Sequence, residues 1–453
     1  MDIHLRIRRE LLIQLAALGA AVLGVGAARA QTGERVPVLV TPGAERAYRI
    51  AVQRFFDAVA PDDPSIASFR VAILEALEYS SAFSRIEEDA YLEDSLTSPP
   101  FEESDTIVCS NWGQIGTDVL LQGEIVRDAA QIGVAFRVWD ITRCRDLLRR
   151  RYTQSSDVKP IEVARRIADD VVEAFLGVRG VSSTEIAFVS DRSGSKEIFV
   201  MDADGSRQRA ATANRSINAF PDWSPAGDAI LYTSYRYENR PYLFLSSRGQ
   251  IEPGRLLPQL GDDRSQLRGV FDPAGERIAL VMSEPGGASD IYTVLRNGHR
   301  LRRLTNSSAI EVSPTWSPDG ERLAFVSDRS GTPQIFLADA DGGNPSRLTF
   351  TGDYNTHPVW SPDGMWIAYE TRVDGQFDIW LIDPDGNVNV PLVTHPRSDE
   401  APSWAPNSRK LVFSSTRRGN ADIYVVDRDG SNLRRLTQGS GNNTSPAWGP
   451  LPR

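Results

Sequence analysis

The sequence is poor in the residues from which catalytic and metal sites are usually built. Its 453 residues include only four histidines and two cysteines. Apart from His4, the histidines are scattered over the C-terminal half, at His299, His357 and His395. The sequence also lacks a G-x-S-x-G turn, a P-loop and a glycine-rich dinucleotide-binding motif. We therefore predict a protein that is not an enzyme and that uses no cofactor or metal ion.

Basic residues are in deficit as well, since 50 lysines and arginines stand against 60 aspartates and glutamates. Proteins that bind nucleic acid are normally basic, so no nucleic-acid partner is expected. The net charge of −10 has a simpler interpretation as a contribution to solubility.

Long apolar runs are missing except near the N-terminus. There, three arginines among the first nine residues precede an apolar run over 11–25, and an Ala-x-Ala cleavage site ends at Ala30. The run is too short for a transmembrane span. We predict a signal peptide over 1–30 and an exported, soluble protein that does not insert into a membrane. Gln31 in place of a cysteine argues against a lipid anchor.

The two cysteines are Cys109 and Cys144. An even, small cysteine count in an exported chain favours one disulfide between them. The alternative is a pair of free thiols that lie too far apart to join.

A repeat occupies the C-terminal part of the chain. Its aromatic anchors stand 48, 45, 44, 44 and 44 residues apart, at Trp223, Phe271, Trp316, Trp360, Trp404 and Trp448. In the typical copy the anchor opens a Trp-Ser-Pro-Asp-Gly turn, and two strands separated by Ser-Asp-Arg follow. Four short strands in about 44 residues are typical of one β-propeller blade.

The phase of the repeat predicts how the ring closes. The first copy begins in mid-repeat at 185–190, and the last stops after an innermost strand around 446–448. We therefore expect the C-terminal strand to complete the first blade and close a six-bladed propeller over 184–453. The copy with Phe271 matches the repeat least well.

Asp-x-Asp-Gly turns recur in the repeat and resemble the start of a calcium loop. They lack the later acidic ligand that an EF-hand needs. Hairpin turns stabilised by aspartate side chains are the preferred interpretation. The turns occupy 202–205, 339–342, 383–386 and 427–430.

The pattern before the propeller predicts a small α/β domain over 47–177 and a linker over 178–183. With the propeller, the predicted fold class of the whole chain is α+β. Val36, Val38 and Val40 alternate in the preceding 31–46, which forms either a first strand or a free tail that adds a strand to a partner's sheet. Strands are expected over 48–55, 83–86, 118–125, 133–140 and 147–152, with helices over 65–80, capped by Ser65, and from Pro160 to Gly177.

From 31 to 450, the domain order, the six repeats and the closing Pro-Ala-Trp-Gly-Pro resemble the TolB family, periplasmic components of the Tol–Pal system. The resemblance implies a monomeric scaffold for outer-membrane integrity and envelope constriction during cell division. In such a protein a mobile tail, here 31–46, engages inner-membrane TolA, and one end of the propeller receives the outer-membrane lipoprotein Pal.

The resemblance places partner contacts in the loops that enter the innermost strands. Five residues before each anchor stands a polar residue, and we expect these six to form a ring at the canal mouth: Asn218, Gln266, Glu311, Asn355, Asp399 and Asn443. Neighbouring candidates are Arg268, Thr356, His357, Glu400 and Thr444, and the rim arginines Arg192, Arg236, Arg329, Arg372 and Arg417 follow the second strands on the same face. The alternative is that loop tips are simply polar.

One feature departs from the family pattern, because Leu267-Arg268-Gly269 replaces the usual Pro-containing segment in one repeat. A second hypothesis for function is an exported propeller enzyme, or a module that binds a small ligand or peptide in the canal. Glu311, Asp399 and Glu400 are the nearby carboxylates that could serve such an enzyme.

Overall fold

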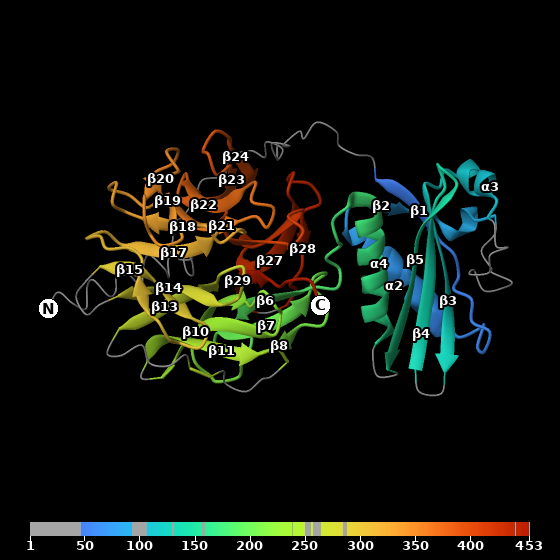
Figure 1. Ribbon diagram of the computed structural model, residues 1–453, viewed down its shortest axis with the longest axis horizontal. Helices are drawn as coiled ribbons and strands as arrows, with labels where there is room; N and C mark the ends of the chain where they lie inside the picture. The colour runs from blue at the N-terminus through green and yellow to red at the C-terminus, as the bar shows by residue number, and fades with distance from the viewer. Residues whose placement is uncertain are drawn as a thin grey trace. The chain divides into compact units, whose positions relative to one another are not determined.

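The computed structural model describes residues 47–92, 107–128, 131–155, 159–237, 239–249, 255–256, 264–283, 288–439 and 441–452. The predicted signal peptide and tail, with Val36, Val38 and Val40, lie outside these ranges. The chain divides into two compact units, which meet in sequence between Ser183 and Thr184 (Figure 1). In the described ranges, no helix has the length and apolar character needed to cross a bilayer.

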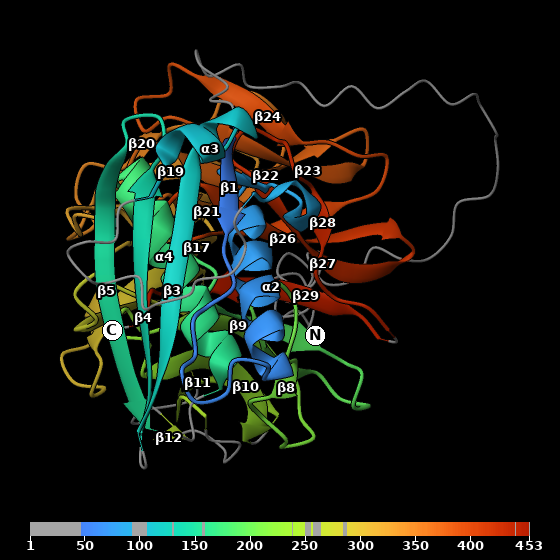
Figure 2. The same cartoon turned by 90° about the vertical axis from the view of Figure 1, so that its right-hand side faces the viewer.

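The N-terminal unit is a five-stranded sheet in the order β2-β1-β3-β4-β5, with two helices over one face (Figures 1 and 2). β1 is parallel to β2 and β3, and the β3-β4-β5 meander is antiparallel. The helices bury Ile73 and Ile167 against Leu121 and Phe136 of the sheet. The elements are β1 (Tyr48–Val52), α2 (Pro64–Tyr79), β2 (Phe83–Arg85), η2 (Glu88–Ala90), α3 (Cys109–Gln114), β3 (Val119–Asp128), β4 (Gln131–Asp140), β5 (Arg145–Ser155) and α4 (Pro160–Leu176).

Several predicted boundaries in this unit are wrong, and β3 and β5 run on to Asp128 and Ser155 rather than to 125 and 152. Asp63, not Ser65, caps α2, and its carboxylate accepts a hydrogen bond from the Ser65 N–H. The helix starts earlier because Pro64 suits the first helical position, where a missing N–H costs nothing. β1 ends at Val52 rather than at 55, although Phe56 still bridges to Glu124. At the other helix, Pro160 and the left-handed Gly177 delimit α4 as expected.

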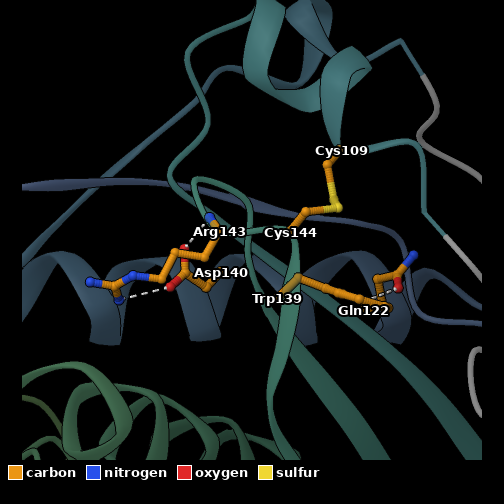
Figure 3. Close-up of a disulfide and its surroundings, with 6 residues drawn as sticks. All are labelled: Cys109, Gln122, Trp139, Asp140, Arg143 and Cys144. Carbon is orange, nitrogen blue, oxygen red and sulfur yellow. Dashed lines mark hydrogen bonds and ion pairs between the residues drawn. A yellow bond between two sulfur atoms is a disulfide. The ribbon is translucent and has the colours of Figure 1, made fainter.

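Cys109 and Cys144 form a disulfide, the pairing that the sequence favours (Figure 3). The bond ties the first residue of α3 to the turn between β4 and β5. Trp112 of α3 packs beside Trp139, whose indole N–H donates to Gln122 Oε1 at 2.9 Å. The disulfide thus fixes a short helix over the sheet face that α2 and α4 leave uncovered.

The C-terminal unit consists of six four-stranded sheets, which confirms the predicted six-bladed β-propeller. Closure is also as predicted, because β29 pairs with β6, with Trp448 opposite Ile186. The first blade contains β29 (Asn443–Trp448), β6 (Glu185–Ser190), β7 (Glu197–Asp202) and β8 (Arg209–Ala210). The second contains β9 (Asn218–Trp223), β10 (Ala229–Tyr237), β11 (Arg240–Ser247) and β12 (Arg255–Leu256). The third contains β13 (Ser265–Phe271), β14 (Arg277–Ser283), β15 (Ser289–Leu295) and β16 (Arg302–Arg303). The fourth blade contains β17 (Glu311–Trp316), β18 (Arg322–Ser327), β19 (Gln334–Asp339) and β20 (Ser346–Arg347). The fifth contains β21 (Asn355–Trp360), β22 (Ile367–Val373), β23 (Gln376–Ile382) and β24 (Asn389–Val393). The sixth contains β25 (Asp399–Trp404), β26 (Lys410–Arg418), β27 (Asn420–Asp427) and β28 (Arg434–Arg435).

The recurring motifs pack each blade against its neighbour. The anchor aromatics are only 5–7% exposed, and Trp316 and Trp360 share one core with residues of adjacent blades. In the Asp-x-Asp-Gly turns the aspartates accept hydrogen bonds within the turn, as Asp341 does from the Gly343 N–H. Gly342 has φ +87°, and a Cβ there would lie 2.0 Å from the Leu304 carbonyl oxygen of the preceding blade. These contacts support hairpin turns rather than calcium loops.

Each innermost strand contains a bulge with one non-glycine residue in the left-handed region. The register shifts at these points in all six blades. The six left-handed residues are Phe220, Arg268, Ser313, His357, Ala401 and Ser445, with φ between +45° and +57°. In five of the six blades proline follows this residue, whereas Gly269 follows Arg268. The bulge turns each of these strands at the wall of the central canal.

This conformation predicts an unusual response to substitution at Ala401, which has φ +54° and is 5% exposed. Ala401→Val should lower the free energy of unfolding by about 2 kcal/mol, because β-branched side chains disfavour the left-handed region. Ala401→Gly should change it by less than about 1 kcal/mol. Ala324→Gly in β18 is the matched control and should be clearly destabilising, since Ala324 lies in a regular buried strand. Urea unfolding of the three variants measures the difference. A valine variant as stable as the glycine variant would contradict the account.

Candidate partner-binding face and canal

The loops that enter the innermost strands lie at the same end of the propeller as the turns between the second and third strands of each blade. We call this end the loop face. The structure places the six predicted ring residues at the starts of the innermost strands, with side chains at most 2% exposed. These side chains lie inside the blades, so the predicted ring offers little surface for direct contact with a partner.

Three of the four amide members of the ring, Asn218, Asn355 and Asn443, bind side chains of the third strand of a blade. Asn218 Nδ2 donates to Glu197 at 2.9 Å, and Asn355 Nδ2 donates to Gln334 at 2.7 Å. A threonine near the end of the same blade completes each cluster, as Thr349 does by donating to Gln334 at 2.8 Å. These bonds join the innermost strand of one blade to the preceding blade, so the amides have a structural role.

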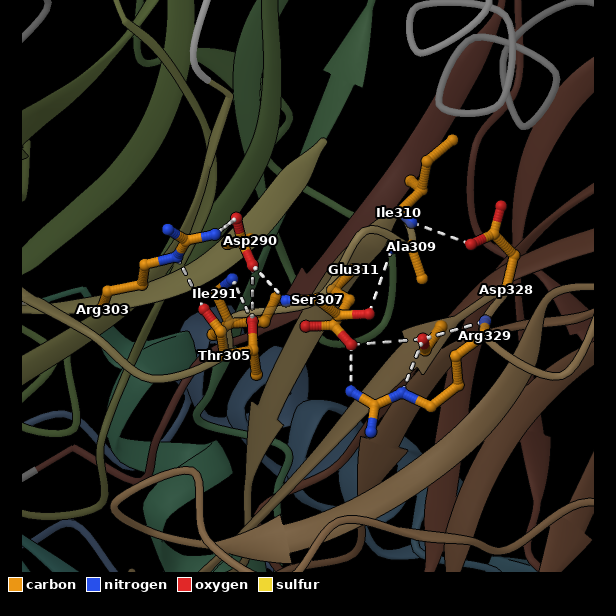
Figure 4. A network of polar contacts seen from close by, with 11 residues as sticks. Asp290, Ile291, Arg303, Thr305, Ser307, Ala309, Ile310, Glu311, Asp328 and Arg329 are labelled. Carbon is orange, nitrogen blue, oxygen red and sulfur yellow. Dashed lines mark hydrogen bonds and ion pairs between the residues drawn. The ribbon is translucent and has the colours of Figure 1, made fainter. Parts of the chain in front are cut away.

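The acidic members of the ring bind rim arginines instead, as Figure 4 shows for Glu311 and Arg329. Glu311 contacts Arg329, and Asp399 contacts Arg417 at 2.9 Å. Burial raises the pKa of the Asp399 carboxyl, and the Arg417 charge opposes that shift. Glu311 and Asp399 thus lie in separate ion pairs and not in a carboxylate pair that could perform acid–base chemistry.

The rim arginines divide into two groups. Arg192, like Arg329 and Arg417, is committed to the ring, since its guanidinium donates to Asn443 at 2.8 Å. Arg236 lies over the ring of Phe244 at 5.3 Å, and Arg372 forms an exposed ion pair with Asp353. Among the five, Arg236 and Arg372 are therefore the better candidates for contact with a partner.

The loop face also presents apolar side chains that we did not predict. Phe350 is 74% exposed, and Ile217 and Tyr237 are 46% and 45% exposed. Phe350 and Ile217 lie in loops that enter innermost strands, and Tyr237 ends a second strand. These exposed side chains could have been predicted from the sequence, because each is a large apolar residue beside or within a polar loop.

The canal contains a cavity of about 70 Å³, which Asp222, Arg268 and His357 help to line. His357 Nδ1 lies 2.9 Å from Glu370 Oε1. Burial lowers the pKa of His357, and the Arg268 charge lowers it further. Glu400 is half-buried beside these groups, and burial together with Glu370 raises its pKa to about 9. Thr356 and Thr444 are also half-buried.

Two family models match the chain. A model described as the TolB beta propeller domain matches residues 172–452, and one described as the TolB amino-terminal domain matches residues 36–147. The chain belongs to the TolB family. The Tol-Pal system protein TolB of Anaeromyxobacter sp. (strain K) is 35% identical over 306 residues, which cover 66% of this chain and 67% of that protein. Its namesake in Anaeromyxobacter dehalogenans (strain 2CP-C) is 34% identical, with the same coverage.

A solved TolB structure shares the fold. The crystal structure of TolB from Acinetobacter baumannii has a TM-score of 0.75 and 23% identity, covering 90% of this chain and 98% of that chain. Membership of the TolB family makes the chain a Tol–Pal system protein, and therefore a component of the cell envelope.

Proposed function

We propose that this TolB-family protein is a periplasmic scaffold that links inner-membrane TolA to the outer-membrane lipoprotein Pal and performs no catalysis. Pal binds the loop face of the propeller, and TolA binds the tail over 31–46. The observation that supports this proposal most strongly is the group of exposed apolar side chains on the loop face, Ile217, Tyr237 and Phe350. Large apolar anchors surrounded by polar groups are typical of protein–protein interfaces.

The polar groups near these anchors can supply specificity. Asp353 and Tyr354 follow Phe350 closely in sequence, and Arg372 forms an exposed ion pair with Asp353 and lies over the ring of Tyr354 at 5.1 Å. Exposed ion pairs are weak and exchange partners readily. Pal can therefore recruit these side chains at small cost, whereas the buried ring stays intact.

Phe350→Asp should weaken Pal binding at least about tenfold, because an aromatic anchor that becomes buried in an interface often contributes 2 kcal/mol or more. The measurement is calorimetric titration of the mature protein with the purified periplasmic domain of Pal from the same organism. Met365→Asp is the matched control: Met365 is 59% exposed, but its turn follows an innermost strand and so lies at the opposite end of the blade.

The control variant should bind Pal like the parent protein. Equal Pal binding by the Phe350 variant and the parent would reject this location for the contact. Failure of the parent protein to bind Pal would reject the proposed function itself.

A further inference from the structure

The canal holds two opposite charges that do not pair with each other. Arg268 and Asp222 both line the cavity, yet no ion pair within 4.0 Å joins them in the part of the chain that the structure describes. Asp222 Oδ2 accepts a hydrogen bond from the Phe271 N–H at 2.9 Å. The Arg268 guanidinium lies over the ring of Phe220, 5.6 Å from its centre. Each charge is thus held by its own neighbours, with the cavity beside both.

The backbone fixes Arg268 at this position. Its N–H donates to Thr233 Oγ1 of the neighbouring blade at 3.0 Å. The next residue is Gly269, where a Cβ would lie 2.7 Å from Leu231 and 2.8 Å from Leu243. Any side chain here would displace the tips of these two buried leucines, so the close approach favours glycine in place of the proline that follows the other five bulge residues. The repeat therefore departs from its own pattern at the point where a cation enters the canal.

Both charges are poorly solvated. Burial lowers the pKa of Arg268 to about 10 and raises the pKa of Asp222 to about 7. A charge removed from water without a close partner is unfavourable. A ligand that supplies the missing opposite charges would therefore gain binding free energy at two points.

The surrounding groups decide between ligand classes. Asp222 and Glu370 oppose a simple anion, and Arg268 opposes a simple cation. His357, whose pKa is lowered, adds a ring that is neutral at pH 7 and above. A net-neutral ligand with separated charges can pair its negative group with the arginine and its positive group with a carboxylate. The cavity volume of about 70 Å³ is several times the roughly 10–15 Å³ that one water molecule needs, so the cavity admits only a compact ligand.

We propose that this cavity binds a compact zwitterion such as a free α-amino acid, with its carboxylate on Arg268 and its ammonium group on Asp222. A guanidinium binds a carboxylate through two parallel N–H···O hydrogen bonds, and a carboxylate accepts from an ammonium group in turn. The site goes beyond the scaffold function, and its test needs neither Pal nor TolA.

The first test compares three probes by calorimetric titration of the full mature chain at pH 8. L-alanine carries both charges, propionate only the carboxylate and ethylammonium only the amine. L-alanine should bind at least about tenfold more tightly than either of the others. Absence of saturable L-alanine binding up to about 50 mM, or equal binding of L-alanine and propionate, would overturn the proposal.

The second test assigns the two charges. Arg268→Gln should weaken both L-alanine and propionate at least about tenfold, whereas Asp222→Asn should weaken only L-alanine. Arg302→Gln is the control, because Arg302 is 63% exposed on the outer strand β16 and should leave all affinities unchanged. Arg268→Lys keeps the charge without the planar fork, and it replaces Arg268→Gln if that variant does not fold. Unchanged L-alanine binding by the folded Arg268 variant would reject the site.

Discussion

Removal of residues 444–453 is expected to abolish cooperative unfolding of the propeller. The deletion takes away most of β29, the innermost strand of the blade that contains β6. It also removes Trp448, which is 7% exposed and donates its indole N–H to Thr184 Oγ1 at 2.8 Å. β6 would then present a free, largely apolar edge, and such edges pair with other chains. Thermal unfolding by circular dichroism and the molar mass in solution report the two effects.

Removal of residues 451–453 alone is the matched control, because it shortens the chain but leaves β29 intact. This variant should remain a monomer with the melting temperature of the parent protein. A soluble, monomeric 444–453 deletion with unchanged melting would contradict the closure of the ring by β29.

Arg417→Met is expected to lower the free energy of unfolding by about 3 kcal/mol. Arg417 is 10% exposed and lies 2.9 Å from the fully buried Asp399. Its removal leaves a buried carboxylate without its cation, and that is the costly way to break such a pair. Urea unfolding at neutral pH measures the loss.

Two comparisons separate the buried charge from lost packing. The double variant Arg417→Met, Asp399→Leu should recover most of the stability, because no charge is then left unpaired. Arg372→Met removes the equivalent arginine of the preceding blade, where the ion pair to Asp353 is 43% and 68% exposed. It should cost less than about 1 kcal/mol. A double variant as unstable as Arg417→Met would show that packing, not charge, explains the effect.

The fold was predictable because the repeat carries both a period and a phase. The spacing of the anchors indicates four short strands per copy, and the incomplete copies at 185–190 and 443–448 complement each other. No further information is needed to close the ring. In the N-terminal unit, apolar periodicity predicted the helices, but the preference of proline for the first helical position decided where α2 begins.

The candidate site was predicted less well, because sequence position does not show where a polar side chain finds its partner. Three of the four ring amides bind residues 21 positions earlier, as Asn218 binds Glu197 and Asn355 binds Gln334. The fourth, Gln266, has Leu245 at that separation. The ring acids bind arginines 18 positions later, as Asp399 binds Arg417. These constant separations are visible in the sequence, and they would have indicated a structural role for the ring.

The left-handed bulges were harder to predict from the sequence than the fold. A proline after Ser313, His357 or Ala401 excludes a helical conformation at these positions, but it does not specify the sign of φ. The cavity that the bulges line depends on contacts between blades. Those contacts, such as the Arg268 N–H to Thr233, join residues that share no pattern in the sequence.

The most direct test of the scaffold proposal is whether one molecule of the mature protein holds TolA and Pal together. The C-terminal domain of TolA from the same organism is immobilised, and the periplasmic domain of Pal is added with and without the mature protein. The account predicts that Pal is retained only when the mature protein is present, and that removal of 31–46 abolishes retention without affecting Pal binding in solution. Retention of the mature protein on TolA with no Pal, under conditions where Pal saturates it in solution, would contradict a link between the two partners.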